Sequence, residues 1–211
     1  MKNLRRSFDR FCFQHRNKGI PNLMLYMVLG SAVTYLFSLI TNNALLYNLL
    51  CFNRTAILQG QVWRLFTYAL IYRPRSLGGI GGHLLAAFAL YCFYSFGRAA
   101  EQSMGTFKFN LYILSGIVLQ DVFCMITGTP AVIDSLKWSM FLVFATQCPD
   151  SSIHLYGIIP IKAWVWALID LGLIAYEVIS LRAYFPHNLF PLISIINFVL
   201  FFGNHIGGQT A

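Results

Sequence analysis

The chain has 211 residues, of which 57% are hydrophobic and only 10% are charged, and its formal net charge at pH 7 is +8. A soluble domain usually carries about 25% charged residues. The composition therefore excludes an ordinary soluble domain and favours a membrane protein with several spans. Many of the basic residues lie in the first eighteen positions, before the first apolar segment. Such a tail is typical of a topology signal, so we expect no nucleic-acid partner.

Six apolar segments follow along the chain. A spanning helix needs about 20 residues at a rise of 1.5 Å each, and most of the segments meet this length. The fourth and sixth are short, which predicts helices that begin below the membrane surface. The six expected spans are 23–41, 80–98, 107–127, 132–148, 158–180 and 187–203.

These segments predict an all-α membrane protein. We expect a basic cytoplasmic segment over 1–22 and a single six-helix membrane domain over 23–211, with both termini cytoplasmic because basic residues are more frequent on that side. We expect a bacterial cell membrane first and the endoplasmic reticulum second. The five cysteines are scattered without ligand spacing, so we predict no metal site and no cofactor.

The longest loop, 42–79, is unusual because it is not plainly hydrophilic. Within it, "GQVWRLFTYALIY" places Arg64 between Trp63 and Leu65, with further apolar residues on both sides. Irregular backbone at membrane depth must be buried in protein or line a cavity. We therefore expect this loop to fold against the helical bundle.

Three stretches resemble the rhomboid superfamily of six-span membrane proteins. "GQVWRLFTYAL" is similar to the Trp-Arg motif of the rhomboid first loop, and "HLLAAFALYCFYSFGRAAEQSMG" is similar to the second span, with His83, Glu101 and Gly105 in the matching places. The segment "CPDSSIHLYGIIPIKAWVWALID" resembles compact rhomboid-like bacterial proteins and, more distantly, derlins. The resemblance implies a six-helix bundle with a membrane-dipping first loop, organised by hydrogen bonds from Arg64 beside Trp63. The alternative for Arg64 is an interfacial side chain that reaches the lipid headgroups.

Active rhomboids carry a serine in a Gly-x-Ser-Gly motif on the fourth span and a histidine on the sixth, and the resemblance directs attention to Ser135 and Ser139. Neither serine has a glycine neighbour, and Ala87 stands four residues after His83 where rhomboids carry an asparagine. A serine nucleophile needs a base within hydrogen-bond reach and preorganised donors for the oxyanion. The signature of the serine endopeptidase is therefore incomplete.

The sixth span ends in "NHIGG", which contains His205. Its position predicts a place near the cytoplasmic end, whereas Asn197 is expected at the depth of Ser139, and asparagine cannot act as a general base. We expect His83, Ser139 and Asn197 to form a polar outer layer without a dyad. One alternative is that these residues make ordinary hydrogen-bonded helix contacts; another is a slipped alignment that brings His205 to Ser139.

Five charged residues fall in or near apolar spans and are functional hypotheses by default: Asp121, Asp134, Lys137, Asp170 and Glu177. The expected arrangement is an internal Asp121–Lys137 ion pair between neighbouring helices, with Asp170 and Glu177 on one face of the fifth. An ion path is the alternative.

The leading interpretation is a catalytically inactive, rhomboid-like pseudoprotease whose partners are the lipid bilayer and transmembrane segments of other membrane proteins. Short spans would thin the bilayer around it. The first alternative is an active intramembrane serine protease that uses Ser139 or Ser135 with His205. The second alternative is a small membrane transporter.

Overall fold

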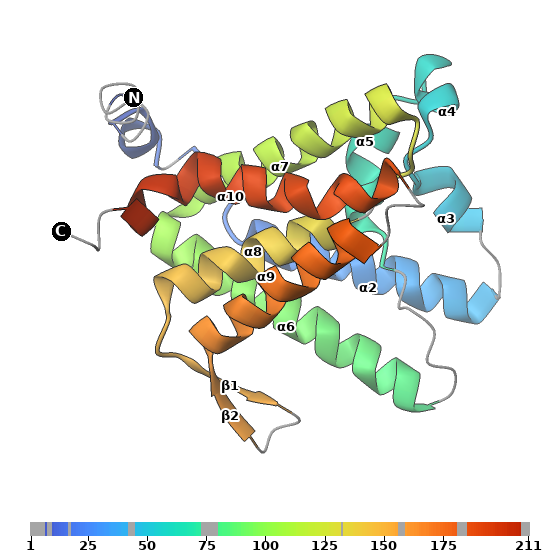
Figure 1. Cartoon of the computed structure of the whole chain (residues 1–211). Helices are drawn as coiled ribbons and strands as arrows, with labels where there is room; N and C mark the ends of the chain where they lie inside the picture. The colour runs from blue at the N-terminus through green and yellow to red at the C-terminus, as the bar shows by residue number, and fades with distance from the viewer. Residues whose placement is uncertain are drawn as a thin grey trace.

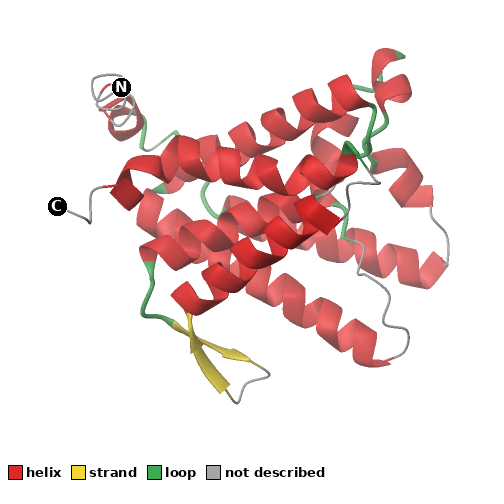
Figure 2. Cartoon of the chain, in the orientation of Figure 1, coloured by secondary structure: helices red, strands yellow, loops and turns green. Residues whose placement is uncertain are grey.

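The structure is a computed structural model that describes residues 7, 10–16, 18–41, 45–72, 80–131, 133–155, 159–180 and 185–207. Within these ranges, only the backbone is described at 80, 134, 135, 152–155, 159–161, 166, 180 and 204–207. The fold is mainly α-helical, as the sequence predicts (Figure 2).

Six helices of 14 or more residues account for most of the described chain, and each overlaps one of the six predicted spans. The second is longer at its C-terminal end than predicted, and the sixth begins after a short 3₁₀ turn, His187–Leu189. The six helices are α2 (Leu23–Thr41), α6 (Ile80–Met104), α7 (Thr106–Thr127), α8 (Asp134–Gln147), α9 (Ala163–Ser180) and α10 (Phe190–Gly207).

The predicted fifth span is wrong at its start. Instead of continuing a helix from 158, the chain forms an antiparallel β-hairpin of β1 (Ser152–Leu155) and β2 (Ile159–Lys162), in which Ser152 pairs with Lys162. The run "IIPIK" is apolar but short, and a short apolar run does not distinguish a strand from a helix. The hairpin projects from one end of the bundle (Figure 1).

Helix α8 lies at the centre of the bundle and packs against α6, α9 and α10. Gly97 of α6 allows a close approach here, because a Cβ atom at that position would lie 2.2 Å from a Met24 side-chain atom and 2.6 Å from one of Met140. The short helices α3 (Leu45–Leu50), α4 (Arg54–Leu58) and α5 (Arg64–Thr67) gather at one end of the bundle, and the C-terminal end of α10 lies at the opposite end (Figure 1).

The outer surface of this bundle is more apolar than that of a soluble protein. Large apolar side chains cover the outer faces of α2, α6, α7, α9 and α10, as for Ile40 and Ile126, which are 83% and 74% exposed. Soluble monomers rarely expose broad apolar surface, whereas lipid favours apolar groups outside and polar groups inside. Among the side chains that the structure describes, the buried polar ones are Ser31, Arg64, Glu101, Gln120, Asp121, Ser139, Asn188, Ser194 and Asn197.

Two of the helices, α2 and α7, are long and apolar enough to cross a membrane. Applied to the described residues, the same criteria of length and composition select no other helix of 18 residues or more. These two helices and the apolar outer surface support association with a membrane.

Candidate functional site: a pinned loop and a buried polar network

Arg64 is 6% exposed at the start of α5 and organises the first loop. Its Nη1 donates hydrogen bonds to the backbone carbonyls of Asn48 (2.7 Å) and Cys51 (2.8 Å), and its Nε donates to Oε1 of Gln61 (2.7 Å). Both carbonyls lie at the C-terminal end of α3, where a helix leaves carbonyls without intrahelical partners. The guanidinium satisfies these carbonyls and connects α3 to α5.

Thr67 supports the same attachment one turn later. Its hydroxyl donates to the carbonyl of Leu50 (2.9 Å), so three carbonyls at the end of α3 accept hydrogen bonds from two residues of α5. Trp63, the partner of Arg64 in the motif, is the N-cap of α5, and its side chain is half-exposed. The pair therefore divides into one buried polar side chain and one outward aromatic ring.

The end of this loop is attached to two long helices. The Tyr68 hydroxyl donates to the carbonyl of Ile117 in α7 (3.4 Å), and Thr34 of α2 donates to the carbonyl of Leu70 (2.9 Å). Burial raises the pKa of Tyr68, and the neighbouring charge of Asp121 raises it further, so the phenol remains a protonated donor. The segment from α3 to η1 (Tyr68–Leu70) thus packs onto the bundle rather than lying apart from it.

Glu101 and Gly105 form a second attachment at the opposite end of the bundle. A carboxylate oxygen of Glu101, which is 8% exposed, accepts a hydrogen bond from the backbone N–H of Asn22 (2.9 Å), just before α2. A negative charge is stabilising at a helix N-terminus. Gly105 has φ +81°, a conformation that disfavours other residues, and it permits the turn from α6 into α7.

Ser139 and Asn197, each 1% exposed, belong to one polar network at the junction of α7, α8 and α10. Tyr112 of α7 bonds the hydroxyl of Ser139 and also donates to the Ser139 carbonyl (3.0 Å). Asn197 donates to the carbonyl of Tyr112 (3.2 Å) and accepts from the Ser115 hydroxyl (2.8 Å). The Ser139 hydroxyl therefore has a phenol as its neighbour, and a neutral phenol is not a base that could activate it.

The predicted outer layer of His83, Ser139 and Asn197 needs correction. His83 bonds the Tyr35 hydroxyl of α2 through its Nδ1 (2.7 Å) and lies on an exposed part of α6, whereas Ser139 and Asn197 are each 1% exposed. The three residues do not form one cluster, because His83 faces the neighbouring helix α2. Ser139 and Asn197 are brought together through Tyr112 and Ser115.

The other catalytic candidates fall on side chains outside the described residues. Ser135 lies in the first turn of α8, and the backbone of His205 lies in the last turn of α10. His205 is eight residues beyond Asn197, which corresponds to about 12 Å along a helix.

The expected ion pair of Asp121 with Lys137 is absent from the described residues. Lys137 Nζ lies 4.6 Å from the ring centroid of Tyr72 and 5.8 Å from that of Phe93, and Asp121 lies beside Tyr68 instead. The two residues project into different neighbourhoods, one toward aromatic rings and one toward the loop. One oxygen of Asp121 has no hydrogen-bond partner.

Asp170 and Glu177 are both partly buried on α9, and one buried oxygen of Asp170 has no hydrogen-bond partner. Among the side chains that the structure describes, no group of three or more His, Cys, Asp or Glu is placed to hold a metal ion.

Tyr112, Ser115, Gln61 and Thr67 were not predicted as site residues. Tyr112 and Ser115 are three positions apart and thus share a helix face, which is the one signal in the sequence that links them. Nothing in the local sequence indicates that this face meets Ser139 or Asn197.

Comparisons of the chain with protein-family models, with curated proteins and with solved structures find no match.

Proposed function

We propose that the chain is a rhomboid-like integral membrane protein of six spans that binds transmembrane segments of other proteins without cleaving them. The observation that carries the proposal is the state of Ser139, whose hydroxyl is buried and bonded to Tyr112 in a network with Asn197. A hydroxyl held in this way has neither an adjacent base nor access for a peptide bond.

Spans beyond α2 and α7 are supported by the exposed apolar side chains on α6, α9 and α10. Helix α8 has 14 residues, about 21 Å, against a hydrocarbon core of about 30 Å. Since α8 is surrounded by other helices, its short length need not affect lipid directly. Bilayer thinning would act instead through α9 and α10, which have 18 residues each, about 27 Å.

Client binding is supported by polar groups that border apolar surface near the start of α6. His83 is exposed and bonded to Tyr35, while the adjacent Leu84 and Leu85 are exposed apolar side chains. A polar residue in a client helix would find a hydrogen-bond partner here that lipid cannot supply. Only one ring nitrogen of His83, Nδ1, bonds Tyr35. The other nitrogen of the imidazole can therefore contact a client.

The test is photo-crosslinking from position 85 in membranes, with single-span client proteins that carry either one asparagine in the outer third of the span or leucine there. We expect crosslinking to the asparagine client to exceed that to the leucine client several-fold, and His83→Phe to abolish this preference. The matched control is Leu114→Phe, a change on the exposed face of α7. Equal crosslinking of the two clients in every variant would contradict the proposal.

A further inference from the structure

The basic N-terminal segment is docked against the first turn of α7. His15 stacks on Phe107 with ring centroids 5.7 Å apart, and Asn110 donates to the carbonyl of Ile20 (3.2 Å). Gly19 lies so close to α7 that an added Cβ atom would be 2.9 Å from Thr106 and 3.0 Å from the backbone of Phe107. Residues 10–16 and 18–20 therefore have a defined place on the bundle, which a topology signal alone would not require.

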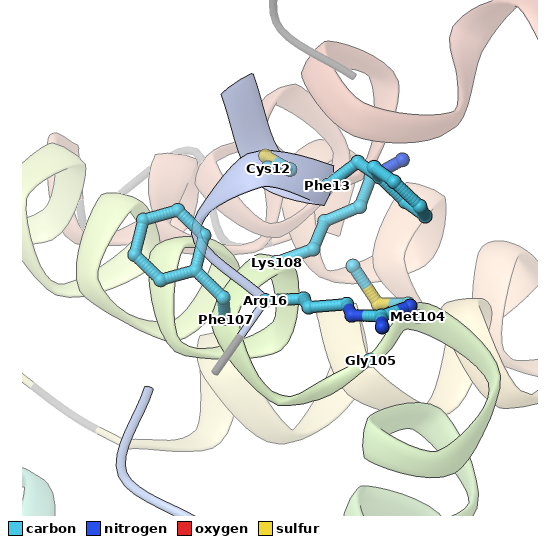
Figure 3. A pocket seen from close by; sticks show the side chains of 7 residues that line it. All are labelled: Cys12, Phe13, Arg16, Met104, Gly105, Phe107 and Lys108. Carbon is cyan, nitrogen blue, oxygen red and sulfur yellow. The ribbon is translucent and has the colours of Figure 1, made fainter. Parts of the chain in front are cut away.

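This docking creates a pocket of ≈ 330 Å³ between the N-terminal segment and the turn from α6 into α7 (Figure 3). Two cationic side chains line it, Arg16 from the N-terminal segment and Lys108 from α7, and both extend away from Phe107 (Figure 3). The Arg16 guanidinium lies over the Phe13 ring at 5.1 Å, which restrains it at the pocket. The other lining residues are Cys12, Phe13, Met104, Gly105 and Phe107.

The pocket also borders the N-terminus of α7, whose N-cap Gly105 provides no side chain to bond the first-turn amides. Two nearby cations beside a helix N-terminus form surroundings suited to a phosphate. Apolar groups flank the same place, since Phe11 and Phe13 are 46% and 68% exposed. An occupant with a phosphate and an apolar body matches both features.

We propose that this pocket binds the phosphate of an anionic phospholipid in the leaflet that faces the N-terminal segment. Arg16 and Lys108 contact the phosphate, and Phe11 and Phe13 enter the boundary between headgroups and acyl chains. Lipid binding at this pocket requires a membrane protein but no client, so the experiment measures bound lipid alone.

The test is native mass spectrometry of the full chain in detergent, titrated with phosphatidylglycerol or phosphatidylcholine. We expect a preference for phosphatidylglycerol that falls roughly 25-fold in the variant Arg16→Gln/Lys108→Gln, since each cation near anionic lipid contributes about fivefold. The matched control is Arg98→Gln, an exposed cation near the end of α6 that does not line the pocket. The site would be overturned if the double variant kept the preference. It would also be overturned if the control variant lost the preference equally, because the lipid would then respond to the overall positive charge of the protein.

Two further arms make the assignment specific. Gly19→Val retains every charge but collides with α7, so we expect it to lose the preference as the double variant does; a retained preference would show that docking is irrelevant and overturn the pocket. Inorganic phosphate should not displace the lipid at equal concentration. Displacement by phosphate as effective as by phosphatidylglycerol would overturn the lipid assignment.

Discussion

The molecule contains two polar groups of residues within apolar surroundings, and they stabilise different parts of the fold. The Arg64 cluster consists of Arg64 and Thr67, which bond to the end of α3, and the Ser139 network consists of Ser139, Tyr112, Ser115 and Asn197. Arg64 and Thr67 donate to backbone carbonyls at the end of α3, where a helix leaves its last carbonyls without intrahelical backbone partners. In the Ser139 network, side chains connect long helices whose backbone bonds are already made. The first cluster makes an irregular loop possible, and the second fixes how three regular helices pack.

The largest effect is therefore expected for Arg64→Ala. It removes the hydrogen bonds that the buried guanidinium donates to Asn48, Cys51 and Gln61, so we expect a loss of about 3–5 kcal/mol in the free energy of unfolding. Thermal unfolding in detergent would measure it. Arg64→Lys should not restore the stability, because an ammonium group cannot reproduce the planar arrangement of N–H donors in a guanidinium. A change in Arg64→Ala no larger than in Arg98→Ala, an exposed arginine, would contradict this view of the loop.

Substitutions of Glu101 test whether the second attachment, between the end of α6 and the start of α2, depends on charge. We expect Glu101→Ala to destabilise the protein by about 1–2 kcal/mol, because the hydrogen bond to Asn22 and the favourable charge near α2 are both lost. Glu101→Gln keeps an acceptor and should cost less. Unfolding by denaturant in detergent would compare the two, and equal costs would show that the charge contributes nothing.

We expect Asn197→Leu to lower the free energy of unfolding by about 1 kcal/mol. A hydrogen bond between membrane helices stabilises less, on average, than one that satisfies an otherwise unpaired backbone carbonyl. The comparison with Arg64→Ala in the same unfolding assay sharpens the distinction between the two clusters. If Asn197→Leu were the more damaging change, the network would be the primary determinant of the fold.

The smallest effect is expected for Thr67→Val, about 0.5–1 kcal/mol, since it removes one hydrogen bond and preserves the shape of the side chain. Combined with Arg64→Ala, it should show non-additive loss because both residues serve the same end of α3. Strict additivity in a double-mutant cycle would separate Thr67 from the Arg64 cluster.

The sequence was most informative where physical requirements are local. Apolar length predicted six long helices, and an arginine among apolar residues predicted a special environment for Arg64. Lateral contacts were not predictable in the same way: the position of His83 does not reveal that it meets Tyr35, and Asp121 was expected beside Lys137 but lies beside Tyr68. The hairpin was missed because its short apolar run is compatible with either secondary structure.

The most direct test of the central proposal is labelling of the full chain in lipid nanodiscs with a fluorophosphonate, a reagent that modifies activated serines. We predict no labelling above the level of Ser139→Ala, because the Ser139 hydroxyl is buried and bonded to Tyr112. Labelling that disappears in Ser139→Ala while persisting in Ser135→Ala would show an activated nucleophile and contradict the proposal of a non-cleaving membrane protein.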